Sequence, residues 1–260
     1  MTIEADRLTV QRLGRIVLHD VSLRIESGQC VSVIGPNGVG KSTLMAALLD
    51  LVPASGQVRI DGTAIRELTR RQIARRIAYV PQFHDGYLGF RVRDVVEAGR
   101  YAHLDPLQSL YADDRHIQAV DEAVAACRIG PLLERSVDTL SGGERQKVWI
   151  AAALAQQTPA LFLDEPATGL DPAHQAELIR IMRRCLARGN TLLVICHDLN
   201  LAIALGGRVI ALREGAVFFD EPAAVMEDVD RLGQLFGTKF ALHRGADGAL
   251  SIQLRVGADA

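Results

Sequence analysis

Short apolar segments separated by turn-forming residues make up the first part of the chain. Such segments predict β-strands, and the continuous apolar run 30–34 predicts a buried strand. A glycine-rich segment follows this strand, and the apolar segment after it, 43–51, predicts a helix. The predicted strands of this part are 3–8, 17–25, 30–34 and 77–80, with a hairpin over 56–65 that turns at Asp61 and Gly62.

The pattern changes to helical spacing between about residue 91 and residue 154, as the apolar positions Val92, Val95 and Val96 illustrate. Strand-like apolar runs return after this block and alternate with helices or turns. They are 160–163, 191–195 and 208–212, followed by a strand over 216–219, a short helix near 225–235 and a hairpin that turns at Asp247 and Gly248.

Short apolar strands that alternate with helices are typical of a parallel sheet covered on both faces, so we predict an α/β fold. The helical block is then an insertion into this core. The predicted domains are an α/β core of mostly parallel sheet with an N-terminal antiparallel β subdomain (1–85 and 156–235), an inserted helical lobe (86–155) and a C-terminal extension (236–260).

The composition of the 260 residues, 48% hydrophobic and 23% charged, is that of an ordinary globular protein. With 29 Lys and Arg against 31 Asp and Glu, the net charge of −2 supplies no basic field, and we expect no nucleic-acid partner. No apolar stretch approaches the ~20 residues that cross a bilayer, and the acidic start lacks signal-peptide regions, which predicts the cytosol. The scattered Cys30, Cys127, Cys185 and Cys196 are predicted to be reduced core thiols.

A phosphate-binding pattern lies between the predicted strand 30–34 and the helix that follows. It fits G-x-x-x-x-G-K-[ST], whose glycines let backbone N–H groups turn inward around a phosphate while the helix dipole adds positive charge. Lys41 is then predicted to contact the β and γ phosphates and Ser42 to bind Mg²⁺. The members of the pattern are Gly35, Pro36, Asn37, Gly38, Val39, Gly40, Lys41 and Ser42.

Two carboxylates end the predicted strand 160–163. Buried parallel strands deliver side chains to the carboxyl edge of the sheet, where ligands bind. Asp164 is therefore predicted to hold Mg²⁺ through water, and Glu165 to polarise an attacking water molecule.

A second candidate anion site opens the helix that runs through Trp149. Ser141 with Glu144 forms a predicted capping box, while Gly142 and Gly143 expose backbone N–H groups at the helix start. Because the chain already has one phosphate cradle, a second one far along the sequence suggests a site between two molecules.

These motifs, joined by Thr43, Gln82, Asp171 and His197, resemble the Walker A, Q-loop, signature, Walker B, D-loop and switch histidine of an ABC transporter ATPase subunit. They occur in the family's order, and the resemblance covers roughly residues 3–220. It implies that Thr43 lies near the α-phosphate, Gln82 senses Mg²⁺ and the attacking water, and His197 contacts the γ-phosphate. Asp171 has an interface role in the family, and a helix N-cap is a compatible second role.

The resemblance also implies an activity, cofactors and partners. The activity is ATP hydrolysis with ATP and Mg²⁺, in which Glu165, His197 and Gln82 are catalytic and Ser42, Gln82 and Asp164 lie at the metal. The implied partners are a second copy in a head-to-tail dimer that sandwiches ATP, integral membrane permease subunits and, indirectly, a periplasmic substrate-binding protein. The subunit would then lie peripherally on the cytoplasmic face of the inner membrane.

The first turn departs from the family pattern. The family usually stacks adenine on an aromatic residue there, but residues 11–17 contain none. Leu13 or Val17 can offer an apolar face, or Arg15 a planar one, with less stacking energy.

The segment from Val92 to His103 resembles ATPases that serve importers of ferric siderophores, haem and cobalamin, as do the signature region and the tail after Gly215. The group often has Pro where Ala102 stands and a bulky residue where Gly169 stands, so metal-ion or molybdate importers remain alternatives. A soluble ABC-type ATPase acting on nucleic acid or ribosomes, and a small-molecule kinase, are alternatives of other classes.

Aromatic residues gather between residues 83 and 111. A docking groove for a partner and the core of the helical lobe both account for such a cluster. The residues are Phe83, Tyr87, Phe90, Tyr101 and Tyr111.

Overall fold

The computed structural model describes residues 1–82, 89–104, 114–246 and 248–255. The chain forms two compact units, one of residues 1–66 with 193–260 and one of residues 67–192. This division follows the packing of the chain, and the predicted domain boundaries stay a prediction.

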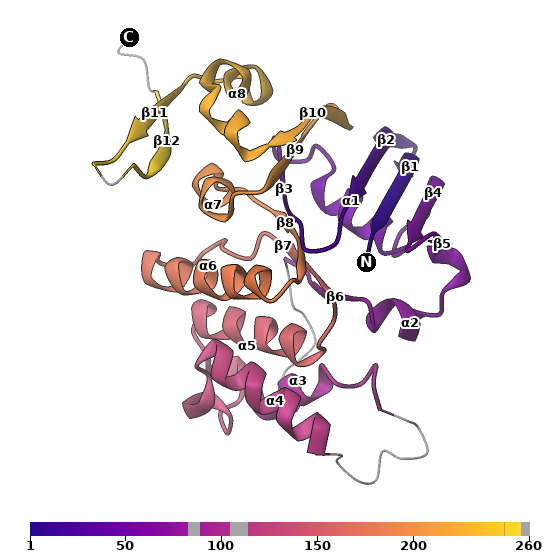
Figure 1. Cartoon of the computed structure of the whole chain (residues 1–260), viewed down its shortest axis with the longest axis vertical. Coiled ribbons are helices and arrows are strands. Elements are labelled where there is room, and N and C mark those ends of the chain that lie inside the picture. The colour runs from indigo at the N-terminus through magenta and orange to yellow at the C-terminus, as the bar shows by residue number, and fades with distance from the viewer. Residues whose placement is uncertain (83–88, 105–113, 247, 256–260) are drawn as a thin grey trace. The chain divides into compact units, whose positions relative to one another are not determined.

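The first unit begins with an antiparallel sheet of order β2-β1-β4-β5 (Figure 1). Its strands are β1 (Ile3–Arg12), β2 (Arg15–Ile25), β4 (Ser55–Ile60) and β5 (Thr63–Ala64). β1 and β2 are longer than predicted because Leu13 and Gly14, with φ of 48° and 76°, form a tight turn whose twist matches that of the strands. The predicted N-terminal β subdomain and the Asp61–Gly62 hairpin are confirmed.

Parallel strands make up the next part of this unit. β3 (Cys30–Ile34), buried along its whole length, pairs in parallel with β9 (Arg208–Arg213), and β10 (Ala216–Pro222) pairs antiparallel with β9. Helices α1 (Lys41–Leu48) and α7 (Leu199–Leu205) belong to the same unit. α1 ends earlier than predicted because the chain reverses at Asp50, where φ is 53° and the next residue, Leu51, bonds back to Ala46.

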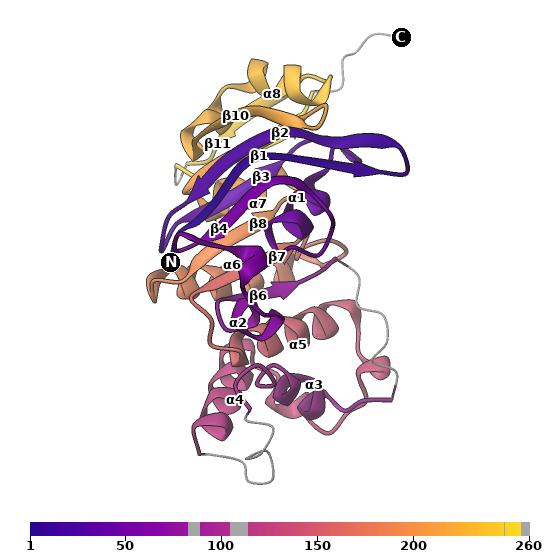
Figure 2. The same ribbon diagram turned by 90° about the vertical axis from the view of Figure 1, so that its right-hand side faces the viewer.

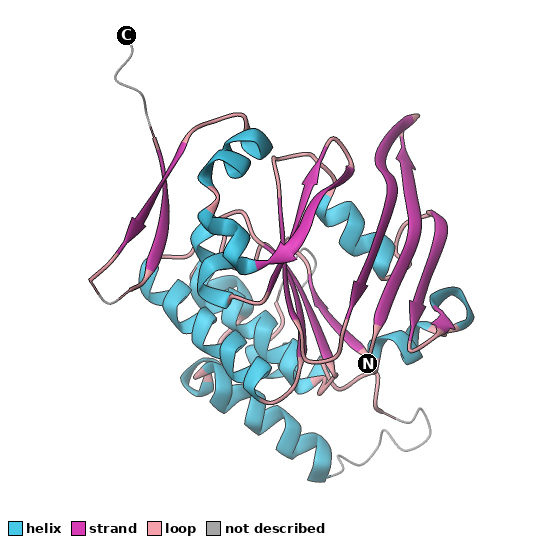
Figure 3. Cartoon of the chain, turned by 45° about the horizontal axis from the view of Figure 1, so that its top comes forward, coloured by secondary structure: helices cyan, strands magenta, loops and turns pink. Residues whose placement is uncertain are grey.

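The end of the chain folds as a short extension. A 3₁₀ turn (Ala223–Glu227) and α8 (Val229–Phe236) replace the single helix predicted near 225–235, because Asp228 ends the turn and caps α8 by accepting from the Arg231 N–H. β11 (Phe240–Arg244) and β12 (Leu250–Leu254) pair antiparallel as predicted, next to the C-terminus in Figure 3. Asp247 of the predicted turn lies outside the described residues.

The second unit contains the helical part of the chain. β6 (Ile77–Val80) and β7 (Ala160–Asp164) pair in parallel, and α3 and α4 pack against α5 (Figure 2). Its helices are α2 (Arg70–Ala74), α3 (Val92–Ala98), α4 (Asp114–Cys127), α5 (Gly142–Ala155) and α6 (Pro172–Ala187), with 3₁₀ turns at Ile65–Glu67, Gly130–Leu132 and Val137–Thr139. The turn Ile65–Glu67 begins in the first unit and ends in the second, and β8 (Thr191–Ile195) runs from the second unit into the first.

These strand pairings confirm the predicted α/β fold. No helix of the described ranges is long and apolar enough to cross a membrane. The four cysteines are buried and none of them forms a disulfide bond, as predicted. Seven polar or charged residues are buried among those described, and three of them, Lys41, Thr43 and Asp164, belong to the predicted site. Because burial of such groups is costly unless they are paired, these positions are suited to bind a ligand or form an ion pair.

Candidate nucleotide site

The glycine-rich loop curls around the ammonium group of Lys41. Lys41 Nζ donates to the carbonyl oxygens of Gly35 (2.9 Å) and Pro36 (3.1 Å), and the side chain is buried. Gly35 and Gly40 have φ of 146° and 109°. A Cβ on Gly35 would clash with the Leu212 carbonyl oxygen, and a Cβ on Gly40 would lie 2.8 Å from Leu18 Cδ2. The loop thus holds its shape only with glycine at both positions, and it places a fixed positive charge inside a ring of backbone groups.

Helix α1 begins directly after this loop. Its N-cap residue, Gly40, has no side chain to accept from the first-turn N–H groups. An anion such as a phosphate can take this role, since the helix dipole favours negative charge there. Ser42 and Thr43 lie in the same turn, as the predicted magnesium and α-phosphate contacts require.

Val17 lies beside the end of the phosphate loop. A Cβ on Gly40 would meet the Val17 carbonyl oxygen at 3.1 Å and its Cγ1 at 3.3 Å. Leu13, by contrast, is fully exposed at the tip of the β1–β2 turn, and Arg15 is exposed beside it. Of the three candidate adenine contacts, Val17 is the one that the structure places against the phosphate loop.

His197 follows β8 and lies near the start of the phosphate loop. The amide of Cys196 donates to the Val33 carbonyl oxygen (3.0 Å), which holds the end of β8 beside β3. A pocket of about 610 Å³ is lined by Gly35, Pro36 and Asn37 together with His197. Its other wall comes from the C-terminal extension, through Phe236, Phe240, Ile252 and Leu254.

The second unit carries the carboxylates. Asp164 ends β7 and is 3% exposed. Burial and, second, the charge of Asp164 raise the pKa of Tyr79 to about 12. A buried carboxylate at a strand end is a suitable oxygen ligand for a hard cation, so the donor chemistry of Asp164 fits Mg²⁺.

Glu165 is held by two neighbours. Its Oε2 accepts from Gln82 Nε2 (2.8 Å) and from Thr168 Oγ1 (3.2 Å). Its backbone has φ of 49°, a left-handed conformation that is uncommon outside glycine. The structure therefore brings the predicted base and the predicted Q-loop residue into contact.

The start of α5 has the predicted capping box. Ser141 Oγ accepts from the Glu144 N–H (3.3 Å), and Glu144 Oε2 accepts from the Ser141 N–H (2.9 Å). The bonds that the Glu144 carboxylate accepts from the Ser141 N–H and, second, from the Ser141 hydroxyl (3.0 Å) lower the pKa of Glu144. Gly142 and Gly143 are the first two residues of α5, where backbone N–H groups have no acceptor within the helix.

Asp171 caps the N-terminus of α6. Its Oδ1 accepts from the His174 N–H (2.9 Å), and its Oδ2 lies 2.8 Å from His174 Nδ1. Sequence reasoning missed His174, Thr168 and Asn200. The sequence does contain a signal for His174. It stands three residues after the N-cap Asp171, which is the spacing of a capping box, so its ring nitrogen can reach back to the aspartate.

The predicted residues thus form two groups, one in each unit. The phosphate loop, Ser42, Thr43 and His197 belong to the first unit, and the second holds Gln82, the carboxylates Asp164 and Glu165, the signature residues Ser141, Gly142 and Gly143, and Asp171.

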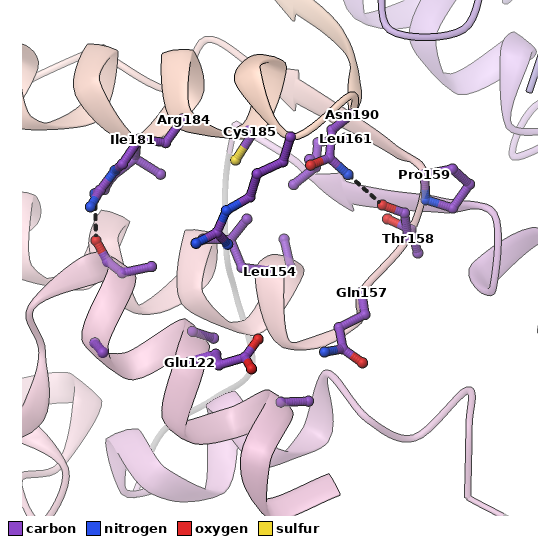
Figure 4. A pocket seen from close by; sticks show the side chains of 16 residues that line it. Glu122, Leu154, Gln157, Thr158, Pro159, Leu161, Ile181, Arg184, Cys185 and Asn190 are labelled. Carbon is purple, nitrogen blue, oxygen red and sulfur yellow. Dashed lines mark hydrogen bonds between the residues drawn. The ribbon is translucent and has the colours of Figure 1, made fainter. Parts of the chain in front are cut away.

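A separate cavity of about 750 Å³ lies among α4, α5 and α6 (Figure 4). Labelled residues such as Glu122, Leu154 and Arg184 line it, and Asn190 Nδ2 bonds the Thr158 carbonyl oxygen (2.9 Å) at its edge. None of the predicted site residues lines this cavity, so it is not part of the nucleotide site.

Comparison with known proteins identifies the family. Residues 18–168 match the family model for the ABC transporter. The haemin import ATP-binding protein of Pseudomonas fluorescens is 41% identical over 242 residues (90% of this chain, 92% of that protein). The ferric enterobactin transport ATP-binding protein of Escherichia coli is 36% identical over 239 residues (91% and 88%), and the iron(3+)-hydroxamate import ATP-binding protein of Bacillus subtilis is 36% identical over 236 residues (88% and 87%).

Solved structures share the fold. A metal-chelate type ABC transporter in an inward-facing conformation superposes with a TM-score of 0.82 at 21% identity, covering 98% of this chain and 96% of that one. A dimeric ATP-binding cassette in a post-hydrolysis state with ADP and phosphate gives 0.74 at 25% identity, covering 85% and 98%. The chain belongs to the ABC transporter family. Within it, the chain is an ATP-binding subunit, and its activity is ATP hydrolysis coupled to transport.

Proposed function

We propose that this chain energises uptake of an iron chelate, haem or cobalamin through a bacterial membrane permease. The observation that carries the proposal is that the relatives with 36–41% identity are ATP-binding subunits for hydroxamate, enterobactin and haemin transport, and that each alignment covers most of both chains. The resemblance of residues 92–103 to this group supports the same substrate class. The subunit would lie on the cytoplasmic face, and a periplasmic carrier would deliver the substrate.

The proposed chemistry assigns a role to each residue. The backbone amides of the phosphate loop (35–42) and Lys41 hold the β and γ phosphates, while Glu165 takes a proton from the water whose oxygen attacks the γ-phosphorus. The bond from that phosphorus to the β–γ bridging oxygen breaks, and ADP leaves. Mg²⁺, held by Ser42 and Asp164, would neutralise phosphate charge when bound. Gln82, which already bonds Glu165, orients the base, and His197 contacts the γ-phosphate.

The signature residues Ser141, Gly142 and Gly143 are proposed to act on the ATP of a second copy. Dimeric cassettes occur among the structural neighbours. A helix end with two glycines and a capping serine is suited to bind an anion that belongs to another molecule. Two ATP molecules would then lie at a two-fold interface.

A permease docking surface is proposed around Phe90 and Tyr101. These side chains are 50% and 79% exposed, so neither belongs to the core of the helical part. Exposed aromatic rings are typical anchors for a protein partner. Phe83, Tyr87 and Tyr111 of the predicted cluster lie outside the described residues.

Growth tests the substrate class. Deletion of this protein should abolish growth on an iron chelate or haem as sole iron source, or uptake of cobalamin, and Glu165→Gln should give the same phenotype. Re-expression of the unaltered chain is the control. Normal use of all three ligand classes, in a strain without a redundant transporter, would overturn the substrate class and favour metal-ion or molybdate import.

A further inference from the structure

His174 connects two segments that the proposed composite site uses. On one side, both carboxylate oxygens of Asp171 are engaged by this residue, one by its N–H (2.9 Å) and one by its Nδ1 (2.8 Å). These hydrogen bonds lower the pKa of Asp171, and the imidazole itself is 29% exposed. The Nδ1 contact therefore holds the ring beside Asp171 at the start of α6, while the bond from the backbone N–H holds the other carboxylate oxygen.

On its other side, the ring of His174 lies against the signature turn, Ser141–Gly143, at Gly143. A Cβ added to Gly143 would lie 2.8 Å from both Cδ2 and Cγ of the imidazole and 3.1 Å from Nδ1. A Cβ on the neighbouring Gly142 would meet nothing within 4 Å. The requirement for glycine at position 143 thus comes from the histidine ring, while position 142 has space for a side chain.

A second link joins the same two helices one turn further along. Lys147 Nζ lies 3.2 Å from Glu177 Oε2, and both side chains are mostly buried. The contact between α5 and α6 therefore continues beyond the first turns of both helices. Within this contact, His174 is the residue nearest to Ser141 and Asp171.

We infer that His174 is a positioning residue that fixes the signature turn, Ser141–Gly143, relative to Asp171. The two segments then reach the nucleotide of a second copy as one rigid unit. This inference rests on the proposed composite site for its effect on hydrolysis, but the positioning itself is a property of the single chain.

Three substitutions at and beside His174 separate positioning from general stability. His174→Ala should lower kcat at least about tenfold, because a small misplacement of binding groups has large effects on rate. ATP binding to the single subunit and the melting temperature should change little, since the phosphate loop is unaltered. His174→Asn, which keeps a donor for Asp171, should recover part of the rate. Arg180→Ala, whose bond to Ala176 stays within α6, is the matched control.

The two glycines provide the sharper test. Gly143→Ala should lose most activity, and His174→Ala in the same chain should restore activity to the level of His174→Ala alone, because the clash is removed. Gly142→Ala should show no such recovery with His174→Ala, since its Cβ meets no atom of the ring. If the double variant is no more active than Gly143→Ala alone, the assigned contact between Gly143 and His174 is contradicted.

Amide hydrogen exchange of the nucleotide-free chain decides the inference independently of activity. His174→Ala should speed exchange at residues 142–145 and 172–175 and leave α1 unchanged. Unchanged exchange in both segments would overturn the inference, even with a fully active enzyme. If the unaltered chain neither dimerises with ATP nor hydrolyses it, the composite site fails, while the exchange result still decides the positioning role.

Discussion

Glu165 combines a strained backbone with two hydrogen bonds to one carboxylate oxygen. Its φ of 49° is a left-handed backbone conformation directly after β7, while Asp164, one residue earlier, is buried at the strand end. The sequence predicted that the two carboxylates would have different roles, because they follow a buried strand. It could not predict the bonds from Gln82 and Thr168. These bonds depend on a left-handed backbone at position 165, and a glutamate there gives no sequence signal for that conformation.

Glu165→Gln should therefore retain ATP binding but lose turnover by about 10²- to 10⁴-fold, the usual contribution of a general base. The amide preserves the shape of the side chain but accepts protons far more weakly than a carboxylate. Single-turnover hydrolysis and equilibrium ATP binding, measured on the same preparation, separate the two effects. Thr168→Ala, which removes the longer of the two bonds, is the control and should have a much smaller effect. Hydrolysis by Glu165→Gln within tenfold of the unaltered chain would refute the assignment of the base.

Among the elements, the C-terminal hairpin is attached to the helix that follows His197. Asn200 Oδ1 accepts from the Ile252 N–H (2.8 Å), and its Nδ2 donates to the Ile252 carbonyl oxygen (3.2 Å). Asp198, the N-cap of α7, accepts from the Asn200 N–H (2.8 Å). The hairpin itself was predictable from its turn residues. Its attachment was not, because a side-chain amide that replaces a strand neighbour leaves no periodic pattern in the sequence.

Asn200→Ala should detach the hairpin without unfolding the chain. Loss of both bonds costs about 1–3 kcal/mol, which corresponds to an increase of about 5- to 150-fold in the equilibrium constant for opening of the extension. Limited proteolysis, followed by mass measurement of the fragments, should show faster cleavage after α8. Asn200→Asp keeps the acceptor for the Ile252 N–H, so its cleavage rate should lie between those of the unaltered chain and Asn200→Ala. Equal cleavage rates for all three proteins would show that Asn200 does not hold the hairpin.

At the scale of the whole molecule, the proposed composite sites require two copies of the chain. The phosphate loop and the signature turn each occur once in the sequence, and a head-to-tail dimer with two-fold symmetry completes two sites at once. The presence of one phosphate loop and one distant signature segment predicts this arrangement, and the dimeric cassettes among the structural neighbours support it.

Mixed dimers of two inactive variants test this arrangement, because the composite-site model predicts that both defects fall in the same site. In a heterodimer of a Lys41→Ala subunit and a Gly142→Asp subunit, one composite site carries both defects and the other carries neither. An equal mixture should therefore recover about one quarter of the unaltered rate if subunits exchange freely and the sites act independently, although each variant alone is inactive. Gly142→Asp also places a negative charge where a phosphate must bind, so its own inactivity is electrostatic rather than steric. A mixture that stays inactive means either strict coupling of the two sites or the absence of composite sites. ATP-dependent dimerisation of Glu165→Gln, measured by light scattering, separates these cases, because only composite sites require the nucleotide for association.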